Sequence, residues 1–150
     1  MANEVLHKTT TQLLVGSNTA ALDSTSVPTS VGTLAPSQHL SYPLLDFVLT
    51  FNPGSSFAAG SHVQLLARPL GIDGTNDTPA PDASYVQKLV GIFPTPYTSA
   101  STTTIYSIKC YGVPSDAEHS VEYYLYNKSN GSLAGNWALR VTPRTIVPGA

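Results

Sequence analysis

Apolar and polar residues alternate along many short stretches of this 150-residue chain, which is the pattern of β-strands with one buried face. The clearest stretch covers residues 42–51, and one face of it consists of Leu45, Phe47, Leu49 and Phe51. No window of about a dozen residues keeps the 3.6-residue period of an amphipathic helix. The pattern therefore predicts strands and essentially no helix.

Proline and glycine, with 12 and 11 residues, divide the rest of the chain into pieces of strand length. The predicted strands are residues 5–15, 42–51, 62–70, 85–93, 102–113, 120–127 and 137–142. The Asn130-Gly131 dipeptide is a hairpin signal, so we expect the last two strands to pair, with an extended tail at 143–150. Seven or eight short strands at fairly regular spacing predict one all-β domain, an antiparallel sandwich or barrel.

The segment 16–38 is long, polar and rich in Ser, Thr and Pro. A structureless loop of this length is unusual inside a compact domain, so the segment either holds a short strand at 27–34 or is an arm that becomes ordered on a partner. Residues 24–45 carry no charged side chain but include Leu34, Leu40 and Leu44. We take residues 1–40 as an N-terminal strand and extended arm on a sandwich body at 41–150, and these three leucines as candidate interface residues.

Strand parity also predicts the core. The predicted core residues are Leu45, Phe47, Leu49, Val63, Leu65, Leu89, Ile108, Tyr123, Leu125, Trp137 and Leu139. If Tyr123 and Leu125 face the core, then Tyr124 and Tyr126 face outward. Exposed tyrosines favour interfaces, so both are candidate interface residues. The alternative is that both faces of this sheet are covered and the tyrosines simply pack.

The composition favours a protein that works in an assembly. Only 11% of residues are charged, whereas 34 are Ser or Thr, and hydroxyl groups cost less to bury against a partner than charges do. The net charge of −2 and the scattered Lys and Arg residues argue against a nucleic-acid partner. The apolar stretches are only a few residues long, so we expect no association with a membrane.

The residue types that carry chemistry are sparse and scattered. Cys110 is the single cysteine and lies in a predicted strand, where a thiol is usually a small buried hydrophobe. The four histidines are far apart in sequence, and Asp73 and Asp77 lack the regular spacing of a calcium loop. We therefore expect no catalytic residue, no metal and no cofactor. Exchanging Cys110 or His119 for alanine is expected to leave assembly and stability nearly unchanged.

Several stretches, in this order, resemble the decoration or cement proteins of tailed bacteriophages. The stretches are residues 61–68 (SHVQLLAR), 72–76 (IDGTN), 89–93 (LVGIF), 111–114 (YGVP), 122–134 (EYYLYNKSNGSLA) and 139–143 (LRVTP). Each motif alone is weak, and their shared order over roughly residues 40–145 carries the resemblance. The segment 16–38 has no counterpart in the family.

This resemblance implies a β-sandwich or jelly-roll fold and a non-enzymatic virion protein that binds and cements the outer surface of a capsid lattice. The implied partners are the major capsid protein and further copies of the chain, as a homodimer or a trimer. We expect the protein to be made in the host cytoplasm and to reside on the capsid surface. The alternative function is a tail-associated or host- or carbohydrate-binding β module of the virion.

Overall fold

The chain forms a two-layered β-sandwich in the computed structural model, which describes residues 5–9, 11–24, 27–39, 41–82, 88–97, 99–101, 103–116 and 118–148. The strands are β1 (Val5–Thr9), β2 (Leu13–Asn18), β3 (Thr29–Leu34), β4 (Leu44–Phe51), β5 (His62–Leu70), β6 (Leu89–Pro94), β7 (Tyr106–Pro114), β8 (Ser120–Asn127) and β9 (Trp137–Pro148). Within these residues, the helix is a single turn, α1 (Pro36–His39). The prediction of an antiparallel β-sandwich is confirmed.

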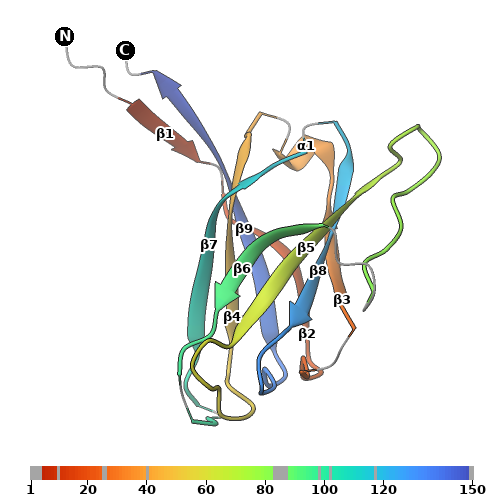
Figure 1. The fold of residues 1–150 in the computed structure, drawn as a ribbon. Helices are drawn as coiled ribbons and strands as arrows, with labels where there is room; N and C mark the ends of the chain where they lie inside the picture. Colours follow the sequence, from red (N-terminus) through yellow and green to blue (C-terminus); the bar gives the residue numbers. More distant parts are fainter. Residues whose placement is uncertain are drawn as a thin grey trace.

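The strand order is that of a jelly roll. One sheet has the order β1-β9-β4-β7, with β2 also paired to β9, and the other has the order β3-β8-β5-β6 (Figure 1). Four antiparallel pairs are nested in the sequence, namely β2 with β9, β3 with β8, β4 with β7 and β5 with β6. A chain that folds as a double strand and then wraps into two sheets gives this nesting.

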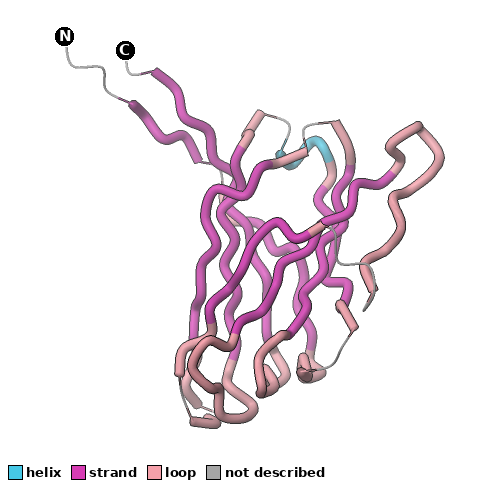
Figure 2. The backbone as a smooth tube through the Cα atoms, in the orientation of Figure 1, coloured by secondary structure: helices cyan, strands magenta, loops and turns pink. Residues whose placement is uncertain are grey.

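Strand β9 is twelve residues long and serves two partners. Its first half pairs with β2, and its last residues pair with β1. The β1–β9 ribbon therefore extends beyond the sandwich at the end where both termini lie (Figure 1). Figure 2 shows the remaining strands packed side by side, with loops gathered at the two ends of the body.

The core lies between the sheets and follows the alternation of the strands. Strand β4 alternates strictly between buried and partly buried positions. Nine of the eleven predicted core residues are at most 1% exposed, namely Leu45, Phe47, Leu49, Val63, Leu65, Tyr123, Leu125, Trp137 and Leu139. Ile108 is partly buried and packs against them. The aromatic rings of Phe47 and Tyr123 meet across the two sheets at 4.9 Å.

The prediction that Leu89 belongs to the core is wrong, because this residue is 46% exposed. The register of β5 and β6 shifts between Leu65 and Leu66, which lie opposite Gly91 and Leu89 respectively. Such a bulge inserts one extra residue, here Val90, and moves the following side chains to the other face. The bulge therefore turns Leu89 away from the core.

The expected hairpin between residues 120–127 and 137–142 is also wrong. Strands β8 and β9 lie in different sheets, so the chain crosses between the layers after Asn127. Side-chain hydrogen bonds hold this crossing. Asn127 Nδ2 donates to the carbonyl oxygens of Leu22 and Gly131, at 2.9 and 2.8 Å, and Ser129 Oγ donates to Asn127 Oδ1 at 2.6 Å. A polar turn thus replaces the tight hairpin that Asn130-Gly131 suggested.

The N-terminal third contains strands that belong to the body. Strand β2 pairs with β9, β3 pairs with β8, and the segment 16–38 therefore contains the short strand, which was one of its two alternatives. At the corner where β2 meets β3, two glycines face backbone. A Cβ atom on Gly16 would lie 2.2 Å from the Val31 carbonyl oxygen, and one on Gly32 would lie 2.0 Å from that of Val15. Only glycine allows the strands to approach so closely.

The described residues include no helix with the length and apolar character that crossing a bilayer requires.

Candidate functional site

The outer face of the β3-β8-β5-β6 sheet carries a second apolar cluster, away from the core. Leu66 of β5 packs there with Tyr124 and Tyr126 of β8. In the register, Leu66 lies beside both Tyr124 and Leu89, and Gln64 lies beside both Tyr126 and Ile92. The apolar surface therefore continues onto edge strand β6, where Leu89 and Ile92 are each 46% exposed. We call these five apolar residues, Leu66, Leu89, Ile92, Tyr124 and Tyr126, the outer apolar face.

Both predicted interface tyrosines lie on this outer face, as strand parity required, but little of them is accessible. Tyr124 is 6% exposed and Tyr126 is 4% exposed. The Lys128 ammonium lies 4.3 Å from the centre of the Tyr126 ring and donates a hydrogen bond to its hydroxyl group. The tyrosines thus form the floor of the outer apolar face, and Leu89 and Ile92 are its accessible part.

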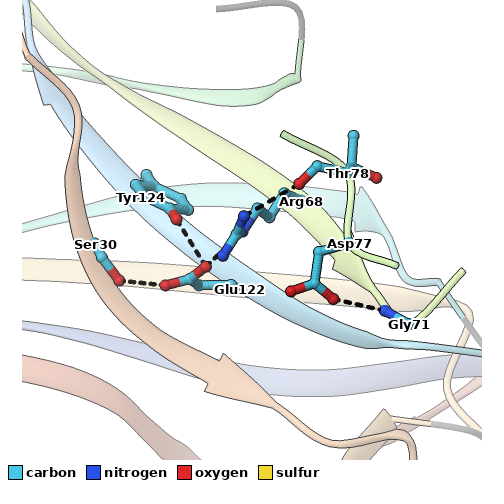
Figure 3. Close-up of polar contacts among 7 residues, drawn as sticks. All are labelled: Ser30, Arg68, Gly71, Asp77, Thr78, Glu122 and Tyr124. Carbon is cyan, nitrogen blue, oxygen red and sulfur yellow. Dashed lines mark hydrogen bonds and ion pairs between the residues drawn. The ribbon is translucent and has the colours of Figure 1, made fainter. Parts of the chain in front are cut away.

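A polar cluster borders this floor at Glu122 (Figure 3). Its carboxylate accepts hydrogen bonds from Ser30 Oγ at 2.7 Å, Tyr124 Oη at 2.7 Å and Arg68 Nε at 2.6 Å. Arg68 also donates to the Thr78 carbonyl oxygen at 3.1 Å, which fastens the loop after β5 to the sheet. The cluster joins three strands, β3, β8 and β5, and one loop.

The cluster shifts the acidity of its members. Burial opposes ionisation of Glu122, but the hydrogen bonds from Ser30, Tyr124 and Arg68 outweigh it, and the pKa of this carboxyl group lies below its ordinary value. For Tyr124, burial and the hydrogen bond to Glu122 raise the pKa to about 12. Both groups are therefore fixed in one protonation state near neutral pH. An ionised carboxylate whose donors are all in place holds structure together and is not poised to transfer protons.

The sequence analysis did not identify this cluster. Parity alone places Glu122 on the face of Tyr124, and Arg68 joins them only because β5 is the neighbour of β8. The pairing of the two strands depends on residues far apart in sequence. Local alternation therefore predicts the face on which Glu122 lies but not the presence of Arg68 beside it.

The three predicted interface leucines have different positions. Leu34 ends β3 and is fully buried at 0% exposure, so it is part of the core in this structure. Leu44 begins β4 and is half-buried. Leu40 lies outside the described residues.

Exposed apolar side chains are concentrated in one stretch of the chain. Five of the eight large hydrophobic residues that are exposed in the described part of the chain lie between residues 89 and 111, namely Leu89, Ile92, Tyr97, Ile105 and Tyr111. This segment includes β6 and β7, which are the last strands of the two sheets. Edge strands present unpaired backbone groups, and apolar side chains beside them favour association.

Two further reactive side chains, those of Cys110 and Asp73, serve packing and a turn. Cys110 is partly buried beside β6, and burial raises the pKa of its thiol, which makes it a poor nucleophile. The Asp73 carboxylate accepts hydrogen bonds from the Thr75 and Asn76 backbone and from the Asn76 side chain, at 2.6 to 2.9 Å, and these bonds lower its pKa to about 2. These contacts complete a turn within the loop.

The fold brings together two histidines that are far apart in sequence. His39 of α1 is 1% exposed, and neither of its ring nitrogens has a hydrogen-bond partner among the described residues. Burial lowers its pKa, and the His119 backbone and the Asp116 carboxylate offset this only in part. His119 Nδ1 lies 3.0 Å from Asp116 Oδ1. Across the described residues, no group of three His, Cys, Asp or Glu side chains is arranged to hold a metal ion.

Two hollows complete the surface. A small cavity of about 170 Å³ lies where β5, β7 and β8 approach one another, and its wall includes Ala67, Val113, Val121 and Tyr123. A wider trough of about 600 Å³ lies on the outer face of the opposite sheet, over β4, β7 and β9. The cavity is small for an organic ligand, whereas the trough has room for one.

No protein-family model and no curated protein matches the chain. Among solved structures, it is similar to the SPBc2 prophage-derived protein YomS, with 7% identity, a TM-score of 0.37 and coverage of 97% of this chain and 98% of that one. It is also similar to a candidate glycoside hydrolase from Bacteroides thetaiotaomicron, with 13% identity, a TM-score of 0.29 and coverage of 81% of this chain and 41% of that one. At these TM-scores neither likeness identifies the function of the chain.

Proposed function

We propose that this chain is a non-enzymatic structural protein of a tailed-phage virion, which binds and cements the outer surface of the capsid lattice. In this proposal its partners are the major capsid protein and a second copy of the chain, with a trimer as the alternative. The observation that carries the proposal is the outer apolar face with its accessible edge at Leu89 and Ile92. Such a surface on a protein with few charges favours permanent association.

The size of this surface suits a repeated contact. Burying a fully exposed Leu or Ile side chain contributes about 1.5–3 kcal/mol, and Leu89 and Ile92 are each about half exposed. One such contact is weak. A lattice presents many equivalent contacts to an oligomer, and linked contacts raise the overall affinity steeply.

Two further observations support the proposal. The motifs between residues 61 and 143 follow the order found in phage decoration proteins. The jelly-roll strand order recurs in viral capsid domains, although a fold by itself does not determine a function.

The test is to isolate DNA-filled heads after removal of the tails and to measure how much of the chain purifies with them. A Leu89→Ser/Ile92→Ser variant should lose binding to expanded heads by about tenfold or more, since two buried aliphatic contacts are removed. A matched control is Leu14→Ser, which removes an exposed side chain of the other sheet. Cys110→Ala and His119→Ala should bind like the original protein.

The proposal fails if the chain purifies with tails only, or if the Leu89→Ser/Ile92→Ser variant folds and binds heads as tightly as the original. Light scattering of the purified chain tests the oligomer separately. A monomer at the concentrations reached during assembly would contradict the homo-oligomer but not the head contact.

The alternative, a host- or carbohydrate-binding β module, is favoured by a different observation. The trough on the sheet of β4, β7 and β9 is large, open and lined by polar side chains with one exposed aromatic ring, Tyr111. This surface faces away from the outer apolar face, so both could operate on one molecule.

A further inference from the structure

The trough on the outer face of the sheet of β9, β4 and β7 has the features of a built binding site. Its volume is about 600 Å³, and its lining includes Val48, Thr50, Ser107, Arg140 and Thr142. In the register, Thr50 lies beside Ser107 of β7, and Val48 lies beside both Lys109 of β7 and Arg140 of β9. Hydroxyl groups and cations from three strands therefore point into this one open trough.

A β-bulge shapes one end of this trough. The register between β4 and β7 shifts between Leu45 and Phe47, and Gly112 of β7 has a φ of 67°, in the left-handed region. The Gly112 N–H group donates to Asp46 Oδ1 at 2.8 Å. Bulges of this kind are frequent beside binding sites because they redirect a side chain. Here the neighbouring residue Tyr111 lines the trough with its side chain 65% exposed.

The charges in the trough are unbalanced. Asp46 Oδ2 lies 2.9 Å from Arg144 Nε, so its negative charge is already matched. Among the described residues, Lys109 and Arg140 have no carboxylate partner. Arg140 Nη1 donates to Thr50 Oγ1 at 3.2 Å, and Lys109 Nζ lies 5.9 Å from the centre of the Tyr111 ring. Two cations thus flank Val48 on a floor of hydroxyl groups.

We propose that this trough binds a segment of an acidic polysaccharide. The C–H face of a sugar ring stacks on Tyr111, because an aromatic face is electron-rich and apolar. The carboxylate of the sugar is bound by Lys109 and Arg140, and hydroxyl groups of the chain exchange hydrogen bonds with Thr50, Ser107 and Thr142. This inference goes beyond the proposed capsid contact and does not depend on it.

Two other anionic ligands fit the trough less well. A nucleic-acid strand needs a longer track of cations than two and several stacking rings, and the chain has a net charge of −2. An acidic peptide would match the cations but offers few hydroxyl groups to the hydroxyl-rich floor. Both serve as arms of the test.

The experiment is calorimetric titration of the purified full chain with oligogalacturonate, a carboxylated sugar polymer. Parallel titrations use maltoheptaose as a neutral sugar, polyaspartate as an acidic peptide and oligodeoxythymidylate as a nucleic acid. Oligogalacturonate should bind at least about tenfold more tightly than the other three, and added salt should weaken this binding by screening the two cations. Equal binding of any of the three, or no binding of oligogalacturonate, would overturn the proposal.

Variants place the binding in the trough. Tyr111→Ala, which removes the stacking ring, and Lys109→Gln/Arg140→Gln, which removes both charges, should each weaken binding of oligogalacturonate by about tenfold or more. The control Lys88→Gln/Lys128→Gln removes two positive charges outside the trough and should bind oligogalacturonate like the original protein. Arg140→Lys, which keeps the charge, should retain most of the binding that Lys109→Gln/Arg140→Gln loses. Urea unfolding confirms that each variant is folded, and a folded trough variant that binds normally would refute the assignment.

Discussion

The Glu122 carboxylate links three strands through its hydrogen bonds. It loses water on the face of the sheet, and three hydrogen bonds, from Ser30, Arg68 and Tyr124, replace that water. Charge-assisted hydrogen bonds of this kind are about twice as strong as neutral ones. The carboxylate therefore holds β3, β8 and β5 together at one point.

The first prediction concerns the pH dependence of this cluster. At pH 7, Glu122→Gln should lower the free energy of unfolding by about 1–3 kcal/mol, because three donors, of which Tyr124 is buried, lose a charged acceptor. The pKa of Glu122 in the folded protein lies below its ordinary value of 4.5. Its stabilisation is therefore complete above pH 4.5 and is lost as the pH falls through the lower, folded value.

Urea unfolding over a series of pH values measures this difference. The difference between the original protein and Glu122→Gln should shrink on acidification. Glu118→Gln, at an exposed position, is the control and should change stability by less than about 0.5 kcal/mol. A difference that does not vary with pH would show that the charge of Glu122 contributes nothing.

The second prediction concerns the aromatic core. Phe47 and Trp137 are at most 1% exposed, and the Trp137 Nε1 atom donates to the Ala20 carbonyl oxygen at 3.0 Å. Truncation of either to alanine should cost about 3–5 kcal/mol in urea unfolding followed by circular dichroism. Tyr97→Ala, at a residue 83% exposed, should cost little. A loss below about 1 kcal/mol for Phe47→Ala would contradict its place in the core.

At the scale of elements, the corner between β2 and β3 depends on two glycines. Gly32 has no positive φ, so alanine is acceptable there for the local backbone. A Cβ atom at this position would nevertheless lie 2.0 Å from the Val15 carbonyl oxygen, which belongs to the opposite sheet. The position is therefore restricted by packing between strands and not by its own conformation.

The third prediction follows from this contact. Gly32→Ala should lower the free energy of unfolding by about 1–3 kcal/mol, because one strand must move away from the other. Ser17→Ala, at an exposed position of β2, should change it by less than about 0.5 kcal/mol. Urea unfolding of both variants tests this. Equal stability of Gly32→Ala and the original protein would mean that the two strands separate easily.

At the scale of the whole molecule, the nested pairing joins the beginning of the chain to its end. Strand β2 pairs with β9, and β3 pairs with β8. Pairs between such distant segments lose much chain entropy on closure, so folding of this chain should be slow compared with that of helical proteins of similar length. Neither sheet is complete without the N-terminal third.

The fourth prediction separates the body from the ribbon at its end. Deletion of residues 2–30 removes β1, β2 and part of β3, with the buried residues Val15 and Leu22, and should abolish cooperative unfolding. Deletion of residues 2–9 removes only β1, which pairs with the last residues of β9, and should leave a folded sandwich. Thermal unfolding followed by circular dichroism distinguishes the two. A cooperative transition in the chain that lacks residues 2–30 would show that β2 is dispensable.

The sequence alone determined where most of the strands lie and most of the side chains that they bury. The bounds of β5 and β8 coincide with the predicted stretches 62–70 and 120–127, and Leu45, Phe47 and Leu49 are buried as their spacing indicated. Alternation is a local property, since neighbouring side chains of a strand point to opposite faces whatever the strand pairs with.

The tertiary structure alone decided which strands pair and what covers each face. Leu34 is buried because β3 joins β8, and Leu89 is exposed because a bulge shifts β6 against β5. Tyr124 points outward beside Glu122 as strand alternation requires, yet Arg68 joins them only through the pairing of β5 with β8. Strand pairing, register shifts and the residues that cover each sheet face all depend on contacts between residues far apart in sequence. Local periodicity does not predict such contacts.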